Sequence, residues 1–190
     1  MKDWLRAYFK TVVIPLYHLQ LKYGLGLVAH GQNIVVRLTN FVPSGLFLKD
    51  FQGDLRISQA RPSSSPLLKT LQSHLDSLPP HYLIHDLITG HFVTVLRFIS
   101  EVAFLSDGFS EIHFYQILAE ELKKYLQEHA SLEFDQDLGI FEKKYQRVLL
   151  NKVRFKIGYA DSAERPLPML GSQLSNPMHS SSTNFGEIYE

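Results

Sequence analysis

Large apolar side chains recur at steps of three and four residues near the start of the chain. These positions are Leu5, Phe9, Val12, Leu16 and Leu19. Because residues three and four apart lie on one face of a helix, the spacing predicts an amphipathic helix over 3–22. Pro15 cannot donate a backbone hydrogen bond, so we expect it to kink or divide this helix.

After two glycines, Gly24 and Gly26, the pattern changes to short apolar runs that are typical of strands. The expected strands cover 25–30, 34–38, 45–50 and 55–57. The segment "TNFVPSG" separates the second strand from the third, and its residue types predict a turn. We therefore expect a β-hairpin over 33–50.

From Leu67 onward the apolar spacing returns to the helical period. The expected helices cover 67–77, 81–88, 91–105, 110–128 and 135–149. A late strand is expected over 152–159. The predicted fold class is α+β, in which a small antiparallel sheet is followed by and packed against a mainly α-helical bundle. The predicted organisation is one domain over 1–160 and an irregular or disordered tail over 161–190, which is rich in Ser, Pro and Asn.

Composition narrows the classes of function. Lys and Arg together number 19, as do Asp and Glu, so no net positive charge favours a nucleic-acid partner. The chain contains no cysteine, which excludes disulfides, thiolate zinc sites and cysteine-ligated iron–sulfur clusters. No run of 18 apolar residues predicts a membrane span, and the first residues do not resemble a signal peptide. We expect a soluble, cytoplasmic protein.

The open end of the hairpin carries the candidate chemistry. If 40–43 form a four-residue loop, Asn33 lies directly opposite Asp50. A carboxamide and a carboxylate at that distance suit a divalent cation such as Mg²⁺, which completes its coordination with water and phosphates. His30 precedes this strand and could donate to an anionic substrate. Alternatively, Asn33 and Asp50 only satisfy the turns at the strand ends.

The segment "KDFQGD" adds two polar side chains after the hairpin, Gln52 and Asp54. Gly53 between them permits a close approach of the backbone.

Three segments resemble a known family. They are "YGLGLVAHGQN", "LFLKDFQGDLRI" and "HYLIHDLITGHFVTVLRFIS". Together they are similar to the NRPS-independent siderophore synthetases, and most of all to the aerobactin-synthase branch. The resemblance runs from about residue 12 to residue 150 and covers the carboxy-terminal, palm-like part of such enzymes.

The resemblance implies an ATP-dependent ligase of siderophore biosynthesis that requires Mg²⁺. Such enzymes activate a carboxylate of citrate, or of a citryl monoamide, as an acyl-adenylate. An amine or hydroxylamine, such as acetyl-hydroxylysine, then displaces AMP and forms an amide. Many members are dimers, so a homodimer is also implied.

The resemblance also implies roles for individual residues. His30 matches the family histidine that contacts the carboxylate substrate. Gln32 and Asn33 match carboxamides near the nucleotide, and Asn33 together with Asp50 matches the magnesium ligands. The residues themselves, and not the resemblance, add Gln52 and Arg97 as candidate contacts with the substrate or an anion, because an arginine fork matches carboxylates and phosphates. Alternatively, a lone arginine in the apolar segment "TVLRFIS" is a buried salt-bridge partner.

Two departures from the family pattern affect these implications. Many members carry a glutamate as a further ligand at the position of Val28, although the aerobactin-synthase branch tolerates an aliphatic residue there. Family enzymes also run to several hundred residues, and their upstream half supplies contacts to the ATP phosphates. We therefore expect the chain to be incomplete alone and to act with such an upstream half. The alternative is a non-catalytic remnant or binding module that retains affinity for citrate or nucleotide.

A second group of polar residues lies on the expected helices. His81 and His85 are four residues apart and His91 follows, a spacing that can hold zinc. The otherwise apolar surroundings favour core or helix-capping histidines instead.

Overall fold

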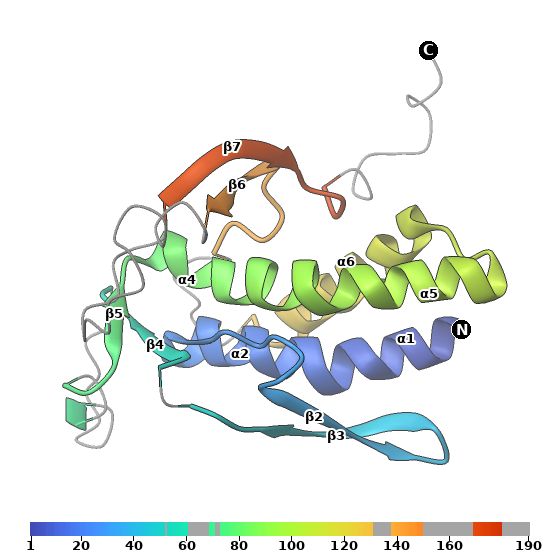
Figure 1. Cartoon of the computed structure of the whole chain (residues 1–190), viewed down its shortest axis with the longest axis horizontal. Helices are drawn as coiled ribbons and strands as arrows, with labels where there is room; N and C mark the ends of the chain where they lie inside the picture. Colours follow the sequence, from blue (N-terminus) through green and yellow to red (C-terminus); the bar gives the residue numbers. More distant parts are fainter. Residues whose placement is uncertain (52, 61–68, 71–72, 131–137, 150–168, 180–190) are drawn as a thin grey trace.

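A computed structural model describes the whole chain except residues 52, 61–68, 71–72, 131–137, 150–168 and 180–190. Three long helical segments run side by side through the molecule (Figure 1). In this view one β-hairpin lies below the helices and another lies above them, while a small three-stranded sheet lies at the left end. This arrangement confirms the predicted α+β class.

The first helical segment confirms the helix predicted over 3–22. It consists of α1 (Lys2–Tyr8), a π-helical turn η1 (Phe9–Val13) and α2 (Ile14–Tyr23). Pro15 lies in the first turn of α2, where the segment changes from π-helical to α-helical turns and continues without a break. Gly24 ends it with a φ of 62°, a left-handed conformation that glycine adopts at little cost.

The second helical segment joins two helices that were predicted separately. It consists of α4 (Pro80–Leu87), the π-helical η2 (Ile88–Leu96) and α5 (Arg97–Asp107). The gap expected between 88 and 91 is filled by the wider π turns of η2. Such π-helical insertions inside α-helices occur often at functional sites.

This second segment is long and apolar enough to cross a membrane, judged by length and composition alone. Its most apolar 18-residue window has a mean hydropathy of 1.4, and 44% of that window is buried inside the protein. A core helix meets the same criterion, so this is weak evidence for a membrane span. The absence of a membrane span therefore stays a prediction.

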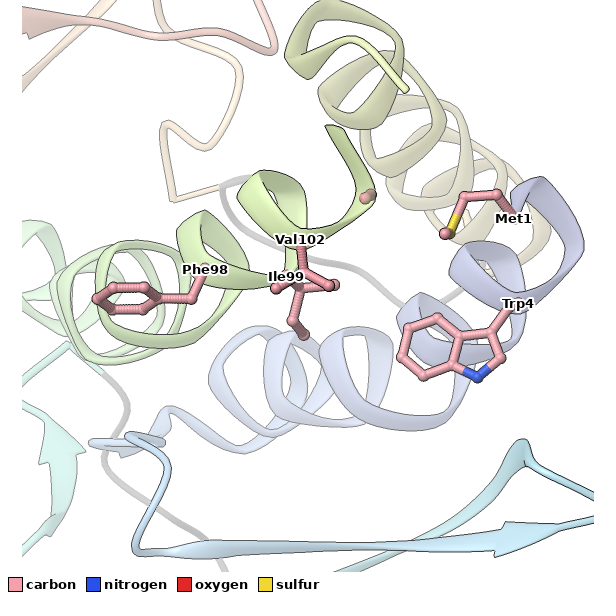
Figure 2. Close-up of a pocket in the computed structure, with 6 residues that line it drawn as sticks. Met1, Trp4, Phe98, Ile99 and Val102 are labelled. Atoms are coloured by element: carbon pink, nitrogen blue, oxygen red, sulfur yellow. The ribbon is translucent and has the colours of Figure 1, made fainter. Parts of the chain in front are cut away.

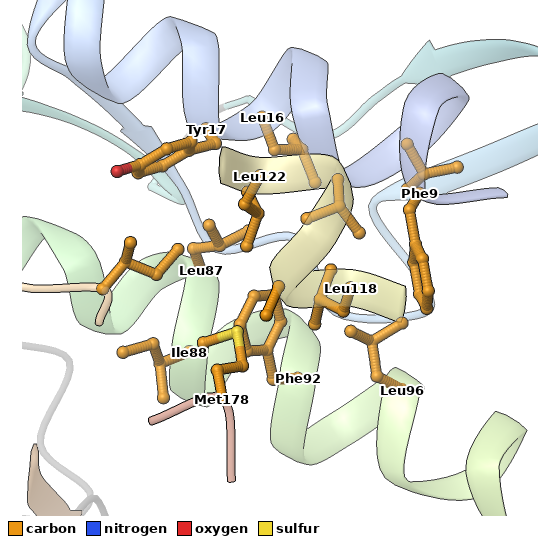
Figure 3. Packing of buried hydrophobic residues seen from close by; sticks show 14 of the residues in the cluster. Phe9, Leu16, Tyr17, Leu87, Ile88, Phe92, Leu96, Leu118, Leu122 and Met178 are labelled. Carbon is orange, nitrogen blue, oxygen red and sulfur yellow. The ribbon is translucent and has the colours of Figure 1, made fainter. Parts of the chain in front are cut away.

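The third helix, α6 (Glu111–Glu128), confirms the prediction for 110–128. Its N-cap is Ser110, whose Oγ accepts a hydrogen bond from the backbone N–H of His113 at 3.3 Å. The three segments bury one continuous apolar core, part of which Figure 3 shows. The labelled side chains there are Phe9, Leu16, Tyr17, Leu87, Ile88, Phe92, Leu96, Leu118, Leu122 and Met178.

The hairpin below the helices consists of β2 (Ile34–Thr39) and β3 (Val42–Leu48). Its tip is held to α1 by Trp4, whose indole N–H donates to the carbonyl of Phe41 at 3.0 Å. The small sheet has the order β1 (Leu25–Leu27), β4 (Leu55–Ser58) and β5 (Asp76–Leu78). The strand β5 corrects the prediction of a helix over 67–77, which is wrong at its end.

The hairpin above the helices corrects two further predictions. Residues expected in a helix over 135–149 instead form β6 (Lys144–Leu149), which pairs with β7 (Met169–Ser175). The predicted irregular tail is therefore wrong over 169–175, and Met178 beyond it is only 1% exposed. The strand predicted over 152–159 lies outside the described residues.

Candidate functional site

The loop between β1 and β2 has the sequence "VAHGQN" and closes on itself around His30. The carbonyl of His30 accepts the backbone N–H of Asn33 at 2.9 Å. Its ring Nδ1 accepts the backbone N–H of Gln32 at 3.2 Å. Because Nδ1 is an acceptor, a neutral ring carries its proton on Nε2. The half-exposed imidazole can therefore donate from Nε2 to an approaching anion.

Asn33 is the buried member of this loop, with 2% of its surface exposed. Its Nδ2 donates to the carbonyl of Val28 at 2.8 Å and to Oδ2 of Asp54 at 3.0 Å. Both amide hydrogens are thus used. Among the residues that the structure describes, none donates to its Oδ1. This oxygen is the part of the side chain that remains to bind a ligand.

The predicted pairing of Asn33 with Asp50 is wrong. The observed partners in the hairpin are Ile34 with Leu48, and the backbone carbonyl of Asn33 accepts from the N–H of Lys49 at 3.0 Å. Asp50 lies one residue further on, with a φ of 57°. Its carboxylate is 63% exposed and lies 3.2 Å from the Lys49 ammonium.

The cause of this difference lies in the turn. Asn40 and Phe41 both have positive φ angles, 50° and 64°, and form a two-residue turn instead of the expected four-residue loop. The register then shifts between Arg37 and Leu38, where Ser44 is the extra residue of a bulge. Beyond the bulge every pair is displaced by one residue from the prediction.

Asp54 takes the place that the prediction gave to Asp50. The backbone N–H of Val28 donates to the Asp54 carbonyl at 3.0 Å, which extends the pairing of β1 with β4. Besides accepting from Asn33, the Asp54 carboxylate lies 3.9 Å from Nε2 of His30. The sequence alone identifies Asp54 as a polar residue after the hairpin but gives it no role. The signal that could have found it is Gly53, whose φ of 85° turns the chain back toward the loop.

A buried acid on α4 lies against β1 and β4, the strands that lead into this region. Asp86 is 3% exposed, and its Oδ1 forms an ion pair with the guanidinium of Arg56. Its Oδ2 has no hydrogen-bond partner among the described residues. A side chain at Gly26 would meet this Oδ2 at 2.5 Å, so only glycine fits in β1 here. Burial raises the pKa of Asp86 to about 7, although Arg56 acts in the opposite direction.

The π-helical segment η2 holds the loop from the other side. His91 is fully buried, and its Nδ1–H donates to the carbonyl of Ala29 at 2.8 Å. Its Nε2 lies 3.3 Å from the hydroxyl of Tyr8, which donates to the neutral ring. Burial lowers the pKa of His91 to about 4. A side chain at Gly90 would come within 3.3 Å of the Ala29 nitrogen.

Of the other predicted contacts, Arg97 is not brought to this loop. Gln52 lies outside the described residues. Arg97 begins α5, stacks its guanidinium over Phe98 at 4.7 Å, and lines a cavity of about 450 Å³ beside the start of α6. His81 contacts the ring of Tyr82, while Nδ1 of His85 is buried without a partner among the described residues.

The donor set can be compared with the needs of Mg²⁺. Among the described residues, no three or more His, Asp or Glu side chains are grouped to hold a metal. Mg²⁺ does not need such a group, because it is usually held by one or two protein oxygens together with phosphates and water. The free Oδ1 of Asn33 and the exposed carboxylate of Asp50 are hard oxygens of the required kind. By the chemistry of their donor atoms, these two residues fit the ion.

A groove of about 560 Å³ lies away from these polar residues, between the start of α1 and α5 (Figure 2). Its lining is almost wholly apolar, and the residues are Met1, Trp4, Phe98, Ile99, Val102 and Ala103. Such a lining offers no charged partner to citrate or to a nucleotide. An exposed apolar surface of this kind is typical of a contact with another polypeptide.

The family model described as "Ferric iron reductase FhuF-like transporter" matches residues 2–162. The chain belongs to this FhuF-like family, and its relatives include siderophore synthetases. This confirms the resemblance drawn from the three sequence segments. The FhuF-like chain has no cysteine, so it cannot hold a cysteine-ligated cluster of the kind that reductases use.

Curated relatives agree with this placement. The chain is 43% identical to the aerobactin synthase of Vibrio mimicus over 94% of its own length and 30% of the relative. It is 42% identical to the aerobactin synthase of Escherichia coli, over 93% of its length and 31% of that enzyme. It is 36% identical to the rhizobactin siderophore biosynthesis protein RhbF of Rhizobium meliloti, over 94% of its own length and 30% of that protein. The FhuF-like chain thus spans about 30% of the length of these relatives.

Solved structures share the fold. The aerobactin synthetase IucC of Klebsiella pneumoniae superimposes with a TM-score of 0.79 at 40% identity, covering 97% of this chain and 32% of that one. The petrobactin biosynthesis protein AsbB of Bacillus anthracis gives a TM-score of 0.75 at 20% identity, covering 96% and 32%. The latter shows that the fold persists where little sequence identity remains.

Proposed function

We propose that this chain is the carboxy-terminal part of an ATP-dependent ligase that makes a hydroxamate siderophore of the aerobactin type. In the proposed reaction a citrate carboxylate attacks the α-phosphorus of ATP and pyrophosphate leaves. The nitrogen of an amine or hydroxylamine then attacks the acyl carbon, AMP leaves, and an amide forms. The match to aerobactin synthases over more than nine tenths of this chain supports the reaction class.

The observation that carries the proposal is the orientation of Asn33. Because both of its amide hydrogens are held by Val28 and Asp54, its Oδ1 is the group left for a ligand beside the half-exposed His30. We assign Asn33 Oδ1 and the Asp50 carboxylate to Mg²⁺. Asn33 Oδ1 and the Asp50 carboxylate would hold the ion, which would supply positive charge to offset that of the nucleotide phosphates.

His30 and Gln32 would bind the organic substrates. The Nε2–H of His30 can donate to a citrate carboxylate, because its Nδ1 is already occupied by the Gln32 N–H. Gln32 itself is exposed, and its carboxamide is free to reach the nucleotide. A relative of this chain is named N(2)-citryl-N(6)-acetyl-N(6)-hydroxylysine synthase, which supports citrate and acetyl-hydroxylysine as the substrate class.

We further propose that the site is completed by an upstream half, on the same polypeptide or on a separate one. The relatives are about three times longer than the stretch this chain matches. The apolar groove and the neighbouring face of α5 support a covering partner, since Phe98 is 55% exposed and Val102 62% exposed. Isolated exposed apolar residues are normal, but a lined groove with several of them favours an interface.

A chimera tests the proposed function directly. This chain would replace the carboxy-terminal 30% of Vibrio mimicus aerobactin synthase, to which it is 43% identical. We expect the chimera to condense a citryl monoamide with acetyl-hydroxylysine in the presence of Mg–ATP. A folded chimera that binds Mg–ATP but forms no amide would favour the alternative, a binding module without catalysis.

A further inference from the structure

We infer that Asp54 is the positioning residue of this site: its carboxylate sets the orientation of the Asn33 side chain and lies beside His30. The expected effects on ligand binding rest on the proposed function, whereas the positioning itself rests on the contacts of Asp54. Asp54 Oδ2 accepts from Asn33 Nδ2 at 3.0 Å and lies 3.9 Å from His30 Nε2. No other described carboxylate contacts both residues.

The carboxylate determines which end of the Asn33 carboxamide is left without a hydrogen bond among the described residues. The amide nitrogen has two acceptors, the Val28 carbonyl at 2.8 Å and Asp54 Oδ2 at 3.0 Å. A flipped carboxamide would place its oxygen against both of these oxygens, with no hydrogen between them. Two acceptors on one side therefore keep Oδ1 on the other side. Without Asp54 only one acceptor remains, and the preference for this orientation weakens.

The backbone around Asn33 cannot replace this constraint. Its N–H donates to the His30 carbonyl at 2.9 Å and its carbonyl accepts from Lys49 at 3.0 Å. These bonds fix the position of the main chain and leave the side-chain torsions to be set by Val28 and Asp54. Of these two acceptors, Asp54 is the one whose position a substitution can change, because the Val28 acceptor belongs to the main chain.

The same oxygen lies near His30 but does not accept a hydrogen bond from it. A separation of 3.9 Å is too long for a hydrogen bond, so Nε2–H stays available to a substrate. The opposite side of the ring is held by the Gln32 N–H on Nδ1. The imidazole therefore has a defined plane, with one edge bonded to the loop and the other beside Asp54.

Asp54 is itself held in place by backbone hydrogen bonds, so its carboxylate has a defined position. Its carbonyl accepts the Val28 N–H at 3.0 Å, and its N–H donates to the Phe51 carbonyl at 3.3 Å. The side chain is 28% exposed, so it is partly shielded from water. The residue thus extends the rigid pairing of β1 and β4 up to the loop that carries the site.

Two substitutions distinguish the effect of the acceptor's position from the effect of its charge. Asp54→Asn keeps an acceptor oxygen at the same distance and removes the charge. Asp54→Glu keeps the charge and moves it by one methylene. Asp76→Asn, at the exposed start of β5, is the control for a general loss of charge.

The first readout does not depend on ligase activity. In the ¹⁵N-labelled 190-residue chain, we expect the two Asn33 side-chain amide protons to resonate apart and to be protected from exchange with solvent. Asp54→Asn and Asp76→Asn should preserve this protection, and Asp54→Glu should lose it while the melting temperature stays close to that of the parent. Unchanged Asn33 amide signals in Asp54→Glu would overturn the inference.

The second readout is calorimetric titration with Mg–ATP. A misplaced hydrogen bond to a charged group corresponds to a loss of affinity of about tenfold, so we expect that loss for Asp54→Glu and at most about twofold for Asp54→Asn. If Asp54→Asn instead loses affinity as Asp54→Glu does, and Mg²⁺ alone shifts the signals of the parent, Asp54 is a metal ligand and the inference is wrong. If the parent binds no Mg–ATP while the amide readout behaves as expected, the proposed function fails and the positioning stands.

Discussion

The side-chain amide of Asn33 donates to the Asp54 carboxylate at 3.0 Å, across the turn that joins β3 to β4. This bond ties the loop before β2 to the segment after the hairpin, so two stretches 21 residues apart form one site. Asp50 lies at the edge of this arrangement with an exposed carboxylate. The site is therefore divided between a buried residue that is held in place and an exposed residue that remains available to a ligand.

Removal of the exposed ligand tests the metal assignment. Asp50→Ala should abolish Mg²⁺-dependent nucleotide binding and change the free energy of unfolding by about 0.5 kcal/mol or less, because the side chain is 63% exposed. Titration with Mg–ATP and urea unfolding measure the two effects. Binding of Mg–ATP with the affinity of the parent would show that Asp50 is not a ligand.

Asn33→Ala should also weaken Mg–ATP binding, but its effect cannot be separated from folding in the same way. The substitution removes one donor from the Val28 carbonyl and one from the Asp54 carboxylate, at a cost of about 1–3 kcal/mol. We expect a clear decrease in the free energy of unfolding. A variant as stable as the parent would contradict the observed hydrogen bonds.

His30→Ala should impair the use of the carboxylate substrate more than the binding of nucleotide. The imidazole is only 31% exposed but makes no hydrogen bond through Nε2 among the described residues, so its loss removes a donor to substrate. In a chimera with the upstream part of a relative, the KM for the citrate substrate should rise about tenfold while Mg–ATP affinity changes little. An unchanged KM for that substrate would remove His30 from the citrate site.

The buried His91 should make stability depend on pH. Its pKa is about 4 in the folded protein and about 6.5 when unfolded. Between these values the unfolded chain binds a proton that the folded chain does not. Stability from this group is therefore fully present above pH 6.5 and is lost as the pH falls toward 4, by on the order of 3 kcal/mol. Urea unfolding over this range should show a smaller acid-side loss for His91→Gln than for the parent.

Asp86 must be considered in the same experiment, because it acts in the opposite direction. Its pKa of about 7 lies above the value of about 3.9 in the unfolded chain, so its contribution falls as the pH rises from 4 to 7. The comparison is therefore between each variant and the parent at each pH. A difference between His91→Gln and the parent that does not change with pH would show that His91 titrates normally.

The apolar groove should contribute to the proposed contact with an upstream half. Phe98→Glu and Val102→Glu place a charge on this surface, while Phe47→Glu places one at a similarly exposed position on the hairpin. We expect the first two to weaken binding of the amino-terminal 70% of Vibrio mimicus aerobactin synthase by about tenfold or more, and Phe47→Glu to have little effect. Equal binding by all three variants would exclude the groove from the interface.

Much of the fold follows from local pattern. The helices over 2–23 and 111–128 have clear apolar periods and clear ends, a left-handed Gly24 and a Ser110 cap. The strand β6 has no such local signal, because it is stabilised by pairing with β7 about 20 residues later. Pairing between distant segments depends on tertiary contacts that no window of sequence contains.

The candidate site was predicted only in part, because its details also depend on contacts that local sequence does not show. The sequence placed His30, Asn33 and Asp50 in one region but gave Asn33 the wrong partner. The error began at Phe41, which adopts a left-handed conformation that bulky side chains rarely take. A two-residue turn there is not signalled by residue type, and together with the bulge at Ser44 it moves every pair beyond the bulge by one position.

The measurement that tests the central claim most directly is the release of AMP and pyrophosphate with Mg–ATP, citrate and a hydroxylamine. We predict no release by the 190-residue chain alone, and citrate-dependent release once the amino-terminal 70% of an aerobactin synthase is added. Asp50→Ala should abolish that release. Citrate-dependent release by the chain alone would contradict the need for an upstream half, and no release from a stable complex of the two parts would contradict the ligase assignment itself.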